Sequence, residues 1–141
     1  EEDRLSLVQG IKENLIDVIV SDHSPEDEES KRLPFAQAAT GAIGIETLLP
    51  LALEMYHNET LPLNKIIETI TINPSKILKI NKGSLKKGAD GDICIFDLEA
   101  PWKLDAEKLK SKSKNTSIEE RKLQGKILMT FLNGELVFNK S

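Results

Sequence analysis

The chain has 141 residues, of which 39% are hydrophobic and 30% are charged, and its formal net charge is −4. This length is enough for one domain with its own core, or for part of a larger protein. Basic residues are scattered or interleaved with acidic ones, which argues against nucleic acid as the main partner. No apolar run approaches the roughly 20 residues that span a bilayer, so we expect no membrane segment. A small-molecule ligand is compatible with this composition.

The cysteine content bears on the cellular compartment. Cys94 is the only cysteine and lies inside the apolar run DICIF. No disulfide can form within the chain, so a reducing cytoplasm is the expected location. We expect the Cys94 side chain to be buried as a small hydrophobic group.

The first elements are a helix and then a strand. Apolar residues at helical spacing predict a helix over residues 3–15, with Asp3 as its N-cap. Residues 16–21 predict a short strand. Apart from Asp17, its first residues are apolar on both faces, which is typical of a strand inside a parallel sheet. A helix followed by a buried strand suggests an α/β repeat.

The next segment is predicted to be a loop that leads into a second helix. The polar run over residues 26–32 is typical of a loop, and the glycine-punctuated segment GAIG follows at residues 41–44. A second amphipathic helix is predicted over residues 45–57. Pro50 should give this helix a kink or a late start.

Two shorter helices complete the first part. One is predicted over residues 63–71, with Pro62 near its first turn. The other should start at Asn73 or Pro74 and carry residues 75–78.

After residue 80 the pattern changes to short strands separated by turns. Strands are predicted over residues 92–97, 126–132 and 135–138. The last two are joined by Asn133-Gly134, a pair that tolerates the positive φ angles of a type I′ hairpin turn. The polar run over residues 111–121 is typical of a surface loop, and residues 103–109 are ambiguous. This part is predicted to be a small β module.

Asp22 and His23 follow directly after the predicted strand of residues 16–21. Active sites of parallel α/β proteins lie at the carboxyl ends of their strands. A carboxylate there can ligate a divalent metal, take a proton from a metal-bound water, or both. The alternatives are that Asp22 caps the following turn and that His23 is a loop histidine with a carbonyl partner.

Four ordered blocks of the sequence resemble the dihydroorotases of the amidohydrolase superfamily. The first is similar to their entry into the last barrel strand, the second to the helix after the barrel, the third to the return to a small β domain, and the fourth to the final loop and hairpin. In order, the blocks are DRLSLVQGIKENLIDVIVSDHSP, TINPSKILKI, GSLKKGADGDICIFDLEAPWKL and SKSKNTSIEERKLQGKILMTFLNGELVF. The run KRLPFAQAATGAIGIETLLPL resembles one branch of dihydroorotases, which favours them over allantoinases and dihydropyrimidinases.

This resemblance implies the carboxyl-terminal portion of a dihydroorotase with an α/β fold. Residues 1–80 would hold the last strand and flanking helices of a metal-dependent (β/α)₈ barrel, and residues 81–141 a small β domain. The implied reaction interconverts N-carbamoyl-L-aspartate and L-dihydroorotate in de novo pyrimidine biosynthesis, with zinc and a bridging water or hydroxide. Asp22 matches the family aspartate that serves as metal ligand and general acid/base.

The substrate-binding residues implied by the resemblance include one departure. The family motif is usually Asp-His-Ala-Pro-His, whose second histidine binds the substrate carboxylate, but Glu26 stands in that place and would repel it. Either Lys31 or Arg32 supplies the missing cation, or this copy is catalytically weak. Thr40 and Gly41 match the pair whose backbone contacts the pyrimidine ring, although Gly41 has the alternative role of a turn glycine.

Most of the family's metal ligands have no counterpart in this sequence. The first-strand His-x-His pair, the lysine that becomes carboxylated and two further histidines are missing, and the only histidines are His23 and His57. Zinc sites need three or four ligands, so we expect this chain alone to bind zinc weakly and to be inactive.

Two other classes of protein remain open. One is a non-catalytic scaffold or activator of aspartate transcarbamoylase, and the other is an independent interaction module built on the β part. For a barrel fragment, residues 16–21 should lack at least one sheet neighbour within the chain, because the barrel partners are missing, and this predicts self-association or pairing with another chain.

Overall fold

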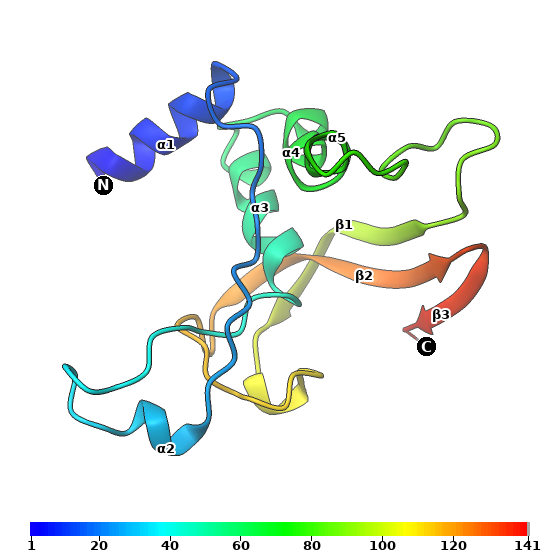
Figure 1. The fold of residues 1–141 in the computed structure, drawn as a ribbon. Coiled ribbons are helices and arrows are strands. Elements are labelled where there is room, and N and C mark those ends of the chain that lie inside the picture. The colour runs from blue at the N-terminus through cyan, green and yellow to red at the C-terminus, as the bar shows by residue number, and fades with distance from the viewer. Residues whose placement is uncertain (141) are drawn as a thin grey trace.

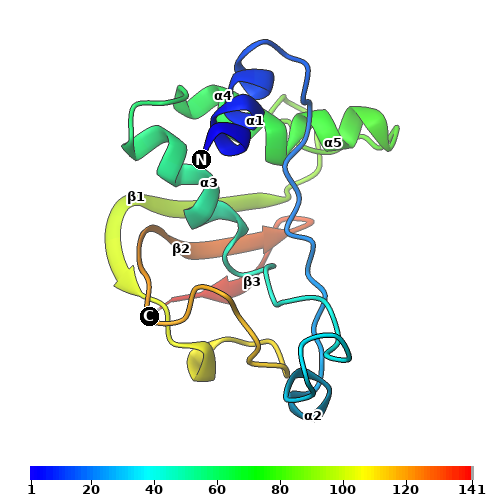
Figure 2. The ribbon, with the colours of Figure 1, turned by 90° about the vertical axis from the view of Figure 1, so that its left-hand side faces the viewer.

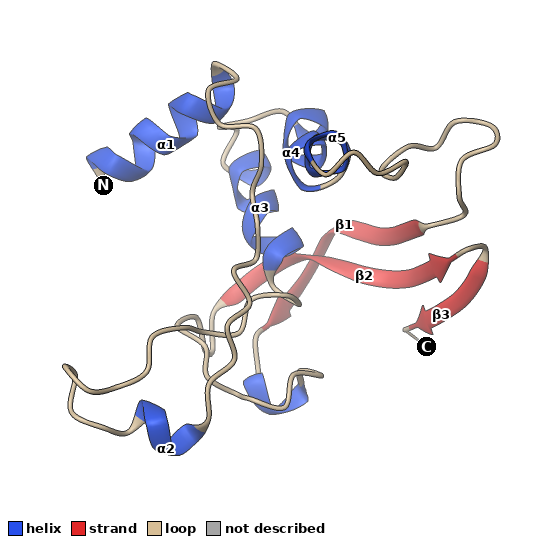
Figure 3. Cartoon of the chain, in the orientation of Figure 1, coloured by secondary structure: helices blue, strands red, loops and turns tan. Residues whose placement is uncertain are grey.

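The computed structural model describes residues 1–140 and shows a group of helices on one side of an antiparallel sheet (Figures 1 and 3). The sheet has three strands in the order β1-β2-β3, and both neighbouring pairs are antiparallel. In chain order the elements are α1 (Glu2–Lys12), α2 (Glu28–Lys31), α3 (Leu48–His57), α4 (Leu63–Ile70), α5 (Ile72–Ile77), β1 (Ile93–Lys103), the short 3₁₀ helix η1 (Ala106–Lys108), β2 (Lys122–Leu132) and β3 (Glu135–Asn139).

The four predicted helices are present; α4 starts at Leu63 as predicted, and the other three have shifted starts. Glu1, not Asp3, occupies the N-cap position of α1, so the predicted cap is wrong. Asp3 lies instead in the first turn, where a carboxylate is favourable at the positive end of the helix dipole. Helix α3 begins late, at Leu48. Pro50 then falls in its first turn, where the missing N–H has no intrahelical acceptor to lose.

The polar run that was predicted to be a loop contains the single-turn helix α2. Asp27 caps this helix, because its Oδ1 accepts a hydrogen bond from the Ser30 amide at 2.8 Å. The Ser30 hydroxyl donates back to the Asp27 carbonyl oxygen at 2.9 Å. The hydrogen bond from the Ser30 amide also lowers the pKa of the Asp27 carboxyl. Asp27 is therefore the residue that marks the start of α2.

The sheet is longer than predicted, and its hairpin is as predicted. Strand β1 continues past residue 97 through an irregular stretch between Asp97 and Pro101. Pro101 lies at the end of that stretch, where a missing N–H interrupts little of the ladder. At the β2–β3 turn, Asn133 and Gly134 have φ angles of 51° and 81°. These positive angles confirm the Asn-Gly turn prediction.

Two apolar cores hold the chain together. The first lies among α1, α3 and α4 and comprises Val8, Ile11, Ala52, Leu61 and Ile66.

The second core lies where α3 packs on β2, and its fully buried members are Leu53, Leu104 and Leu123. A Cβ on Gly125 of β2 would lie 2.4 Å from the Leu53 Cδ1 atom. Glycine at this position therefore allows the helix to approach the sheet closely.

The strand predicted over residues 16–21 is wrong for this chain. The segment is extended, but it pairs with no strand of residues 1–140 and runs along one side of the molecule from α1 towards α2 (Figure 2). Its contacts are to helices: the Ile19 amide donates to the Thr69 carbonyl oxygen at 3.1 Å, and Asn73 Nδ2 donates to the Asp17 carbonyl oxygen at 2.9 Å. A strand needs a neighbouring strand, and the described chain supplies none, so the expected lack of a sheet neighbour is confirmed.

The prediction that Cys94 is buried is also wrong. Its side chain is exposed on β1, and so are those of its neighbours Ile93 and Ile95. Successive residues of a strand point to opposite faces, so both faces of the sheet are uncovered at this end. Exposed apolar residues continue across the other two strands, at Leu132, Leu136, Val137 and Phe138.

Candidate functional site

Asp22 lies immediately after the extended segment and has an unusual backbone conformation. Its φ is +43°, in the left-handed region that few residues other than glycine adopt, and its side chain is exposed. Within residues 1–140, no backbone amide donates a hydrogen bond to its carboxylate, so the turn-capping alternative has no support here. Residues held in sparsely populated backbone conformations are often found at functional sites.

His23 is a positioning residue in this structure. Its Nδ1 accepts hydrogen bonds from the amides of Gly44 and Ile45, at 3.1 and 3.3 Å. Its partners are therefore amides and not the predicted carbonyl, which requires Nδ1 to be unprotonated. The backbone of His23 also forms an isolated parallel bridge with Ala42. The residue after Asp22 thus fastens the GAIG segment to the extended segment.

The two glycines of the GAIG segment allow this close approach. A Cβ on Gly41 would lie 2.7 Å from the Ser24 carbonyl oxygen, and the φ of Gly41 is +120°. A Cβ on Gly44 would lie 2.3 Å from the Ser21 carbonyl oxygen. Any larger residue would push the two segments apart. Asp22 is therefore held between two points of backbone contact, and Gly41 is more than a turn glycine.

Lys31 is brought to the predicted substrate-binding pair, Thr40 and Gly41. Its Nζ donates to the carbonyl oxygens of Ala39 and Gly41, at 2.6 and 3.1 Å. These two residues flank Thr40 in the chain, so the ammonium lies beside the Thr40 backbone. The Thr40 side chain is exposed. An ammonium group has three donors, and these two bonds leave one of them for a ligand.

Arg32 and Glu26 are placed differently. The Arg32 guanidinium pairs with Glu28 one helical turn earlier, and both side chains are largely exposed. Arg32 is therefore engaged on the outer surface of α2. Glu26 is half-buried, and its carbonyl oxygen accepts a hydrogen bond from the Ser113 hydroxyl at 2.6 Å.

The loop over residues 111–121, predicted to be a surface loop, makes hydrogen bonds to the backbone of the site. Besides the Ser113 bond to Glu26, Asn115 Nδ2 donates to the Gly41 carbonyl oxygen at 2.8 Å. The Asn115 carbonyl oxygen accepts from the Ile43 amide at 2.9 Å. Sequence reasoning missed Ser113 and Asn115 because polar residues in a charged run carry no spacing signal.

The described residues do not by themselves fit a zinc site. In residues 1–140 no group of three or more His, Cys, Asp or Glu side chains could hold a metal ion. The second histidine, His57, lies at the end of α3, where its Nδ1 is 3.9 Å from Glu99 Oε2. Asp22 thus offers one exposed carboxylate and no complete ligand set.

The comparisons with known proteins decide the family. Residues 1–137 match the sequence model of the Amidohydrolase family. This chain belongs to the amidohydrolase family. Dihydroorotases from Ehrlichia chaffeensis and Aquifex aeolicus are 44% and 41% identical to it over 138 residues, which are 98% of this chain and 31% and 32% of those proteins. The chain therefore spans about a third of the length of the curated relatives it matches.

Solved structures agree with this placement. An L-hydantoinase (dihydropyrimidinase) from Arthrobacter aurescens matches with a TM-score of 0.89 at 30% identity, covering 97% of this chain and 32% of its own. A dihydropyrimidinase from Brevibacillus agri matches at 0.89 with 20% identity, covering 95% and 31%, and supports the fold alone. The resemblance to dihydroorotases inferred from four sequence blocks is confirmed by the dihydroorotase relatives and by the family match. No helix in residues 1–140 is long and apolar enough to cross a membrane.

Proposed function

We propose that this chain is the carboxyl-terminal part of a cytoplasmic dihydroorotase, the parent enzyme, which interconverts N-carbamoyl-L-aspartate and L-dihydroorotate in pyrimidine biosynthesis. Support comes from the 44% identity to a dihydroorotase over nearly the whole chain, against 30% to the L-hydantoinase. The observation that carries the proposal is the exposed Asp22 carboxylate, held at the end of an extended segment by the glycine contacts of Gly41 and Gly44.

In this proposal Asp22 moves a proton. Opening the ring requires a base to take a proton from the attacking water and an acid to deliver one to the leaving nitrogen. One carboxylate can do both in turn, and the short Asp side chain limits where its oxygens can go. Zinc, bound in the parent enzyme mainly by ligands from outside this chain, would polarise the ring carbonyl. Asp22 is the one metal ligand that we assign here.

We assign the substrate carboxylate to Lys31. Its ammonium already lies at the carbonyl oxygens on either side of Thr40, whereas Arg32 is paired with Glu28. The Gly41 carbonyl oxygen accepts bonds from Lys31 and from Asn115, so both of its lone pairs are used. Backbone contacts to the ring at this pair therefore fall to Thr40 and to the Gly41 amide. Glu26 opposes an anionic substrate and should weaken its binding.

The parent enzyme would supply neighbouring strands for residues 16–21 and cover the apolar surface of the β1–β3 sheet. We propose that residues 16–21 are a wall strand of a (β/α)₈ barrel whose other strands lie outside this chain. The exposed apolar residues of the sheet, among them Ile93, Leu136 and Phe138, are more than a stable monomer normally leaves uncovered. Alone, the chain should self-associate and have no dihydroorotase activity.

A chimera tests the proposal. The matching third of the Ehrlichia chaffeensis dihydroorotase is replaced by this chain, and turnover of dihydroorotate is measured. We expect an active enzyme in which Asp22→Asn lowers kcat by about 10²–10⁴-fold, the usual effect of lost general acid–base help. Lys31→Ala should mainly raise KM, because a charged hydrogen bond contributes about 1.5–3 kcal/mol of binding in ground and transition states alike.

Asp17→Asn is the matched control, since Asp17 is an exposed carboxylate on the same segment, and its kcat should be unchanged. A folded chimera with no activity would contradict the proposed function. Near-normal kcat in Asp22→Asn would remove Asp22 from the catalytic role.

A further inference from the structure

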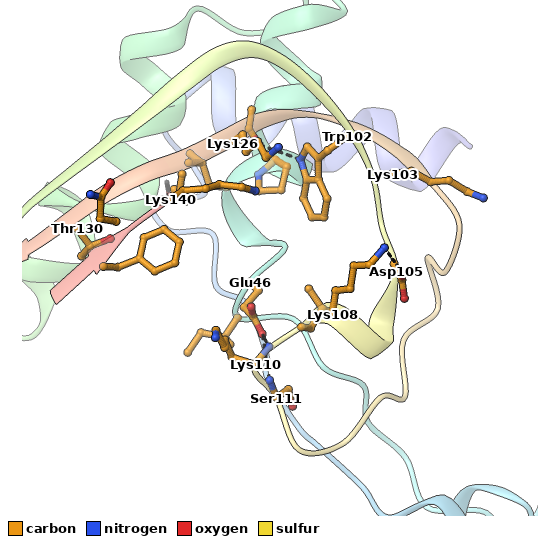
Figure 4. Close-up of a pocket in the computed structure, with 18 residues that line it drawn as sticks. Glu46, Trp102, Lys103, Asp105, Lys108, Lys110, Ser111, Lys126, Thr130 and Lys140 are labelled. Atoms are coloured by element: carbon orange, nitrogen blue, oxygen red, sulfur yellow. Dashed lines mark hydrogen bonds and ion pairs between the residues drawn. The ribbon is translucent and has the colours of Figure 1, made fainter.

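The loop after η1 is joined to the GAIG segment at both of its ends. At one end, Glu46 Oε1 accepts hydrogen bonds from the amides of Lys110 and Ser111, at 2.7 and 3.1 Å (Figure 4). At the other end, the Asn115 carbonyl oxygen accepts a hydrogen bond from the Ile43 amide at 2.9 Å. The loop is therefore a fixed neighbour of the residues that the proposed function places at the substrate.

The Gly41 carbonyl oxygen connects this loop to the cation of the proposed substrate site. Asn115 Nδ2 donates to it at 2.8 Å, and Lys31 Nζ donates to it at 3.1 Å. Glycine has the freest backbone of all residues, and the φ of Gly41 is +120°, so local conformation alone does not fix the direction of its carbonyl group. The Asn115 side chain can fix that direction, because its own backbone is anchored at Ile43.

Lys31 depends on this carbonyl group for its position. Its side chain is a flexible four-carbon stem, and its ammonium donates to the carbonyl oxygens of Ala39 and Gly41. Two hydrogen bonds hold an ammonium group in one place, whereas a single bond lets it swing on its stem. If the Gly41 carbonyl group turned away, Lys31 would lose one of these two bonds and its third donor would change direction.

We propose that Asn115 is a positioning residue for substrate binding, which acts through the Gly41 carbonyl oxygen to direct the Lys31 ammonium at the substrate carboxylate. This inference rests on the proposed function, which assigns the carboxylate to Lys31. Asn115 does not itself touch the substrate. Asp22 is fixed separately, by the hydrogen bonds that His23 Nδ1 accepts. Loss of the Asn115 side chain should therefore weaken substrate binding and leave proton transfer intact.

A double-mutant cycle in the chimera with the Ehrlichia chaffeensis dihydroorotase tests this coupling. Asn115→Ala removes the side-chain donor and keeps the backbone bond to Ile43. We expect KM to rise about three- to tenfold with kcat unchanged, because one neutral hydrogen bond is lost and binding weakens equally in the ground and transition states. In the Lys31→Ala background the same change should alter KM by less than about twofold, since no ammonium remains to be positioned.

Two further variants separate positioning from general stability. Asn115→Asp keeps the shape of the side chain but replaces the donor with a carboxylate that competes for Lys31, so KM should rise at least as much as in Asn115→Ala. Asn81→Asp makes the same exchange at an exposed residue and should change neither constant. Circular dichroism checks that each variant is folded. An Asn115→Ala effect on KM of equal size with and without Lys31, or a lower kcat at unchanged KM, would overturn the proposal.

A measurement on the 141-residue chain needs no activity and keeps this inference apart from the proposed function. In the chain labelled with carbonyl-¹³C glycine, the Gly41 carbonyl resonance should move to lower chemical shift in Asn115→Ala and in Lys31→Ala, because each variant removes one of its two donors. An unchanged Gly41 resonance in Asn115→Ala would overturn the proposal whatever the chimera does. A folded but inactive chimera would instead contradict the proposed function.

Discussion

Residues 16–21 and strand β2 are both rich in apolar, β-forming residues, yet only β2 is a strand. β2 lies between β1 and β3 and pairs with both, whereas the hydrogen bonds of residues 16–21 run to helical residues, through Ile16, Ile19 and the Asp17 carbonyl oxygen, and not to a strand. The backbone groups of a strand need partners on a neighbouring chain segment, and local sequence cannot create those partners. The comparison shows that local composition favours an extended backbone, and that a strand forms only where the fold supplies a neighbouring strand.

Removing the contact between α3 and the sheet should have the largest effect on stability. Leu53 is fully buried between α3 and β2. Leu53→Ala should lower the free energy of unfolding by about 2–5 kcal/mol, from lost apolar burial and the cavity that remains. Urea unfolding measures the loss. Leu85→Ala, at an 83% exposed position, is the control and should change little. Equal losses in the two variants would mean that β2 is not anchored by this core.

Gly125 of β2 lies in the same contact between α3 and the sheet. Gly125→Ala places a methyl group 2.4 Å from Leu53 Cδ1 at a φ of +94° and should cost about 2–4 kcal/mol through overpacking and backbone strain. Gly88 has a similar φ of +87° but no atom near its Cβ position. Gly88→Ala should therefore cost only about 1 kcal/mol, the strain alone. If both variants lose the same stability in urea, close approach of α3 is not what Gly125 provides.

The extended segment should respond in another way. Gly44→Ala forces a methyl group against the Ser21 carbonyl oxygen. Because the hydrogen bonds of residues 21–24 are made to the loop over residues 42–45 and not to the sheet, they should open locally without unfolding the sheet. Limited proteolysis should cut residues 21–45 faster, while the free energy of global unfolding changes by less than about 0.5 kcal/mol. A large global loss would show that this segment belongs to the main cooperative unit.

The smallest effect concerns acid sensitivity of the β2–β3 hairpin. The hydrogen bond from the Asn133 amide and the ammonium of Lys82 lower the pKa of Asp92 below its ordinary value of 3.8. A carboxyl whose pKa is lower in the folded state stabilises that state above pH 3.8, and the stabilisation is lost as the pH falls through the lower folded value. Asp92→Asn should remove this part of the acid sensitivity in thermal unfolding, and Asp17→Asn should leave it unchanged. A carboxyl resonance of Asp92 that titrates at the ordinary value would contradict the assignment.

Local signals in the sequence predicted the elements that depend on local chemistry. Helical spacing identified α1, α3, α4 and α5, and Asn133-Gly134 identified the hairpin. The failures concern features that depend on distant segments. The burial of Cys94 needed a layer over β1, and a strand at residues 16–21 needed a second strand.

The candidate site shows the same division. Asp22 was found because it follows an apolar run, and Gly41 because the motif marks it. The supporting contacts were not found, because Asn115 reaches Gly41 across 74 positions of the chain. Nothing in the spacing of a polar loop predicts such a bond, whereas the structure shows it directly.

Hydrogen exchange on the two compared segments tests whether residues 16–21 are a strand without its neighbours. In the 141-residue chain the amides of Val18, Val20 and Ser21, which have no hydrogen-bond acceptor among residues 1–140, should exchange at nearly the unprotected rate. Amides of Ile127 and Met129 in β2 should be strongly protected. In the active chimera with the Ehrlichia dihydroorotase, protection of Val18, Val20 and Ser21 should rise to the level of β2. Strong protection of these three amides in the chain alone, or none in the active chimera, would contradict a barrel strand at this position.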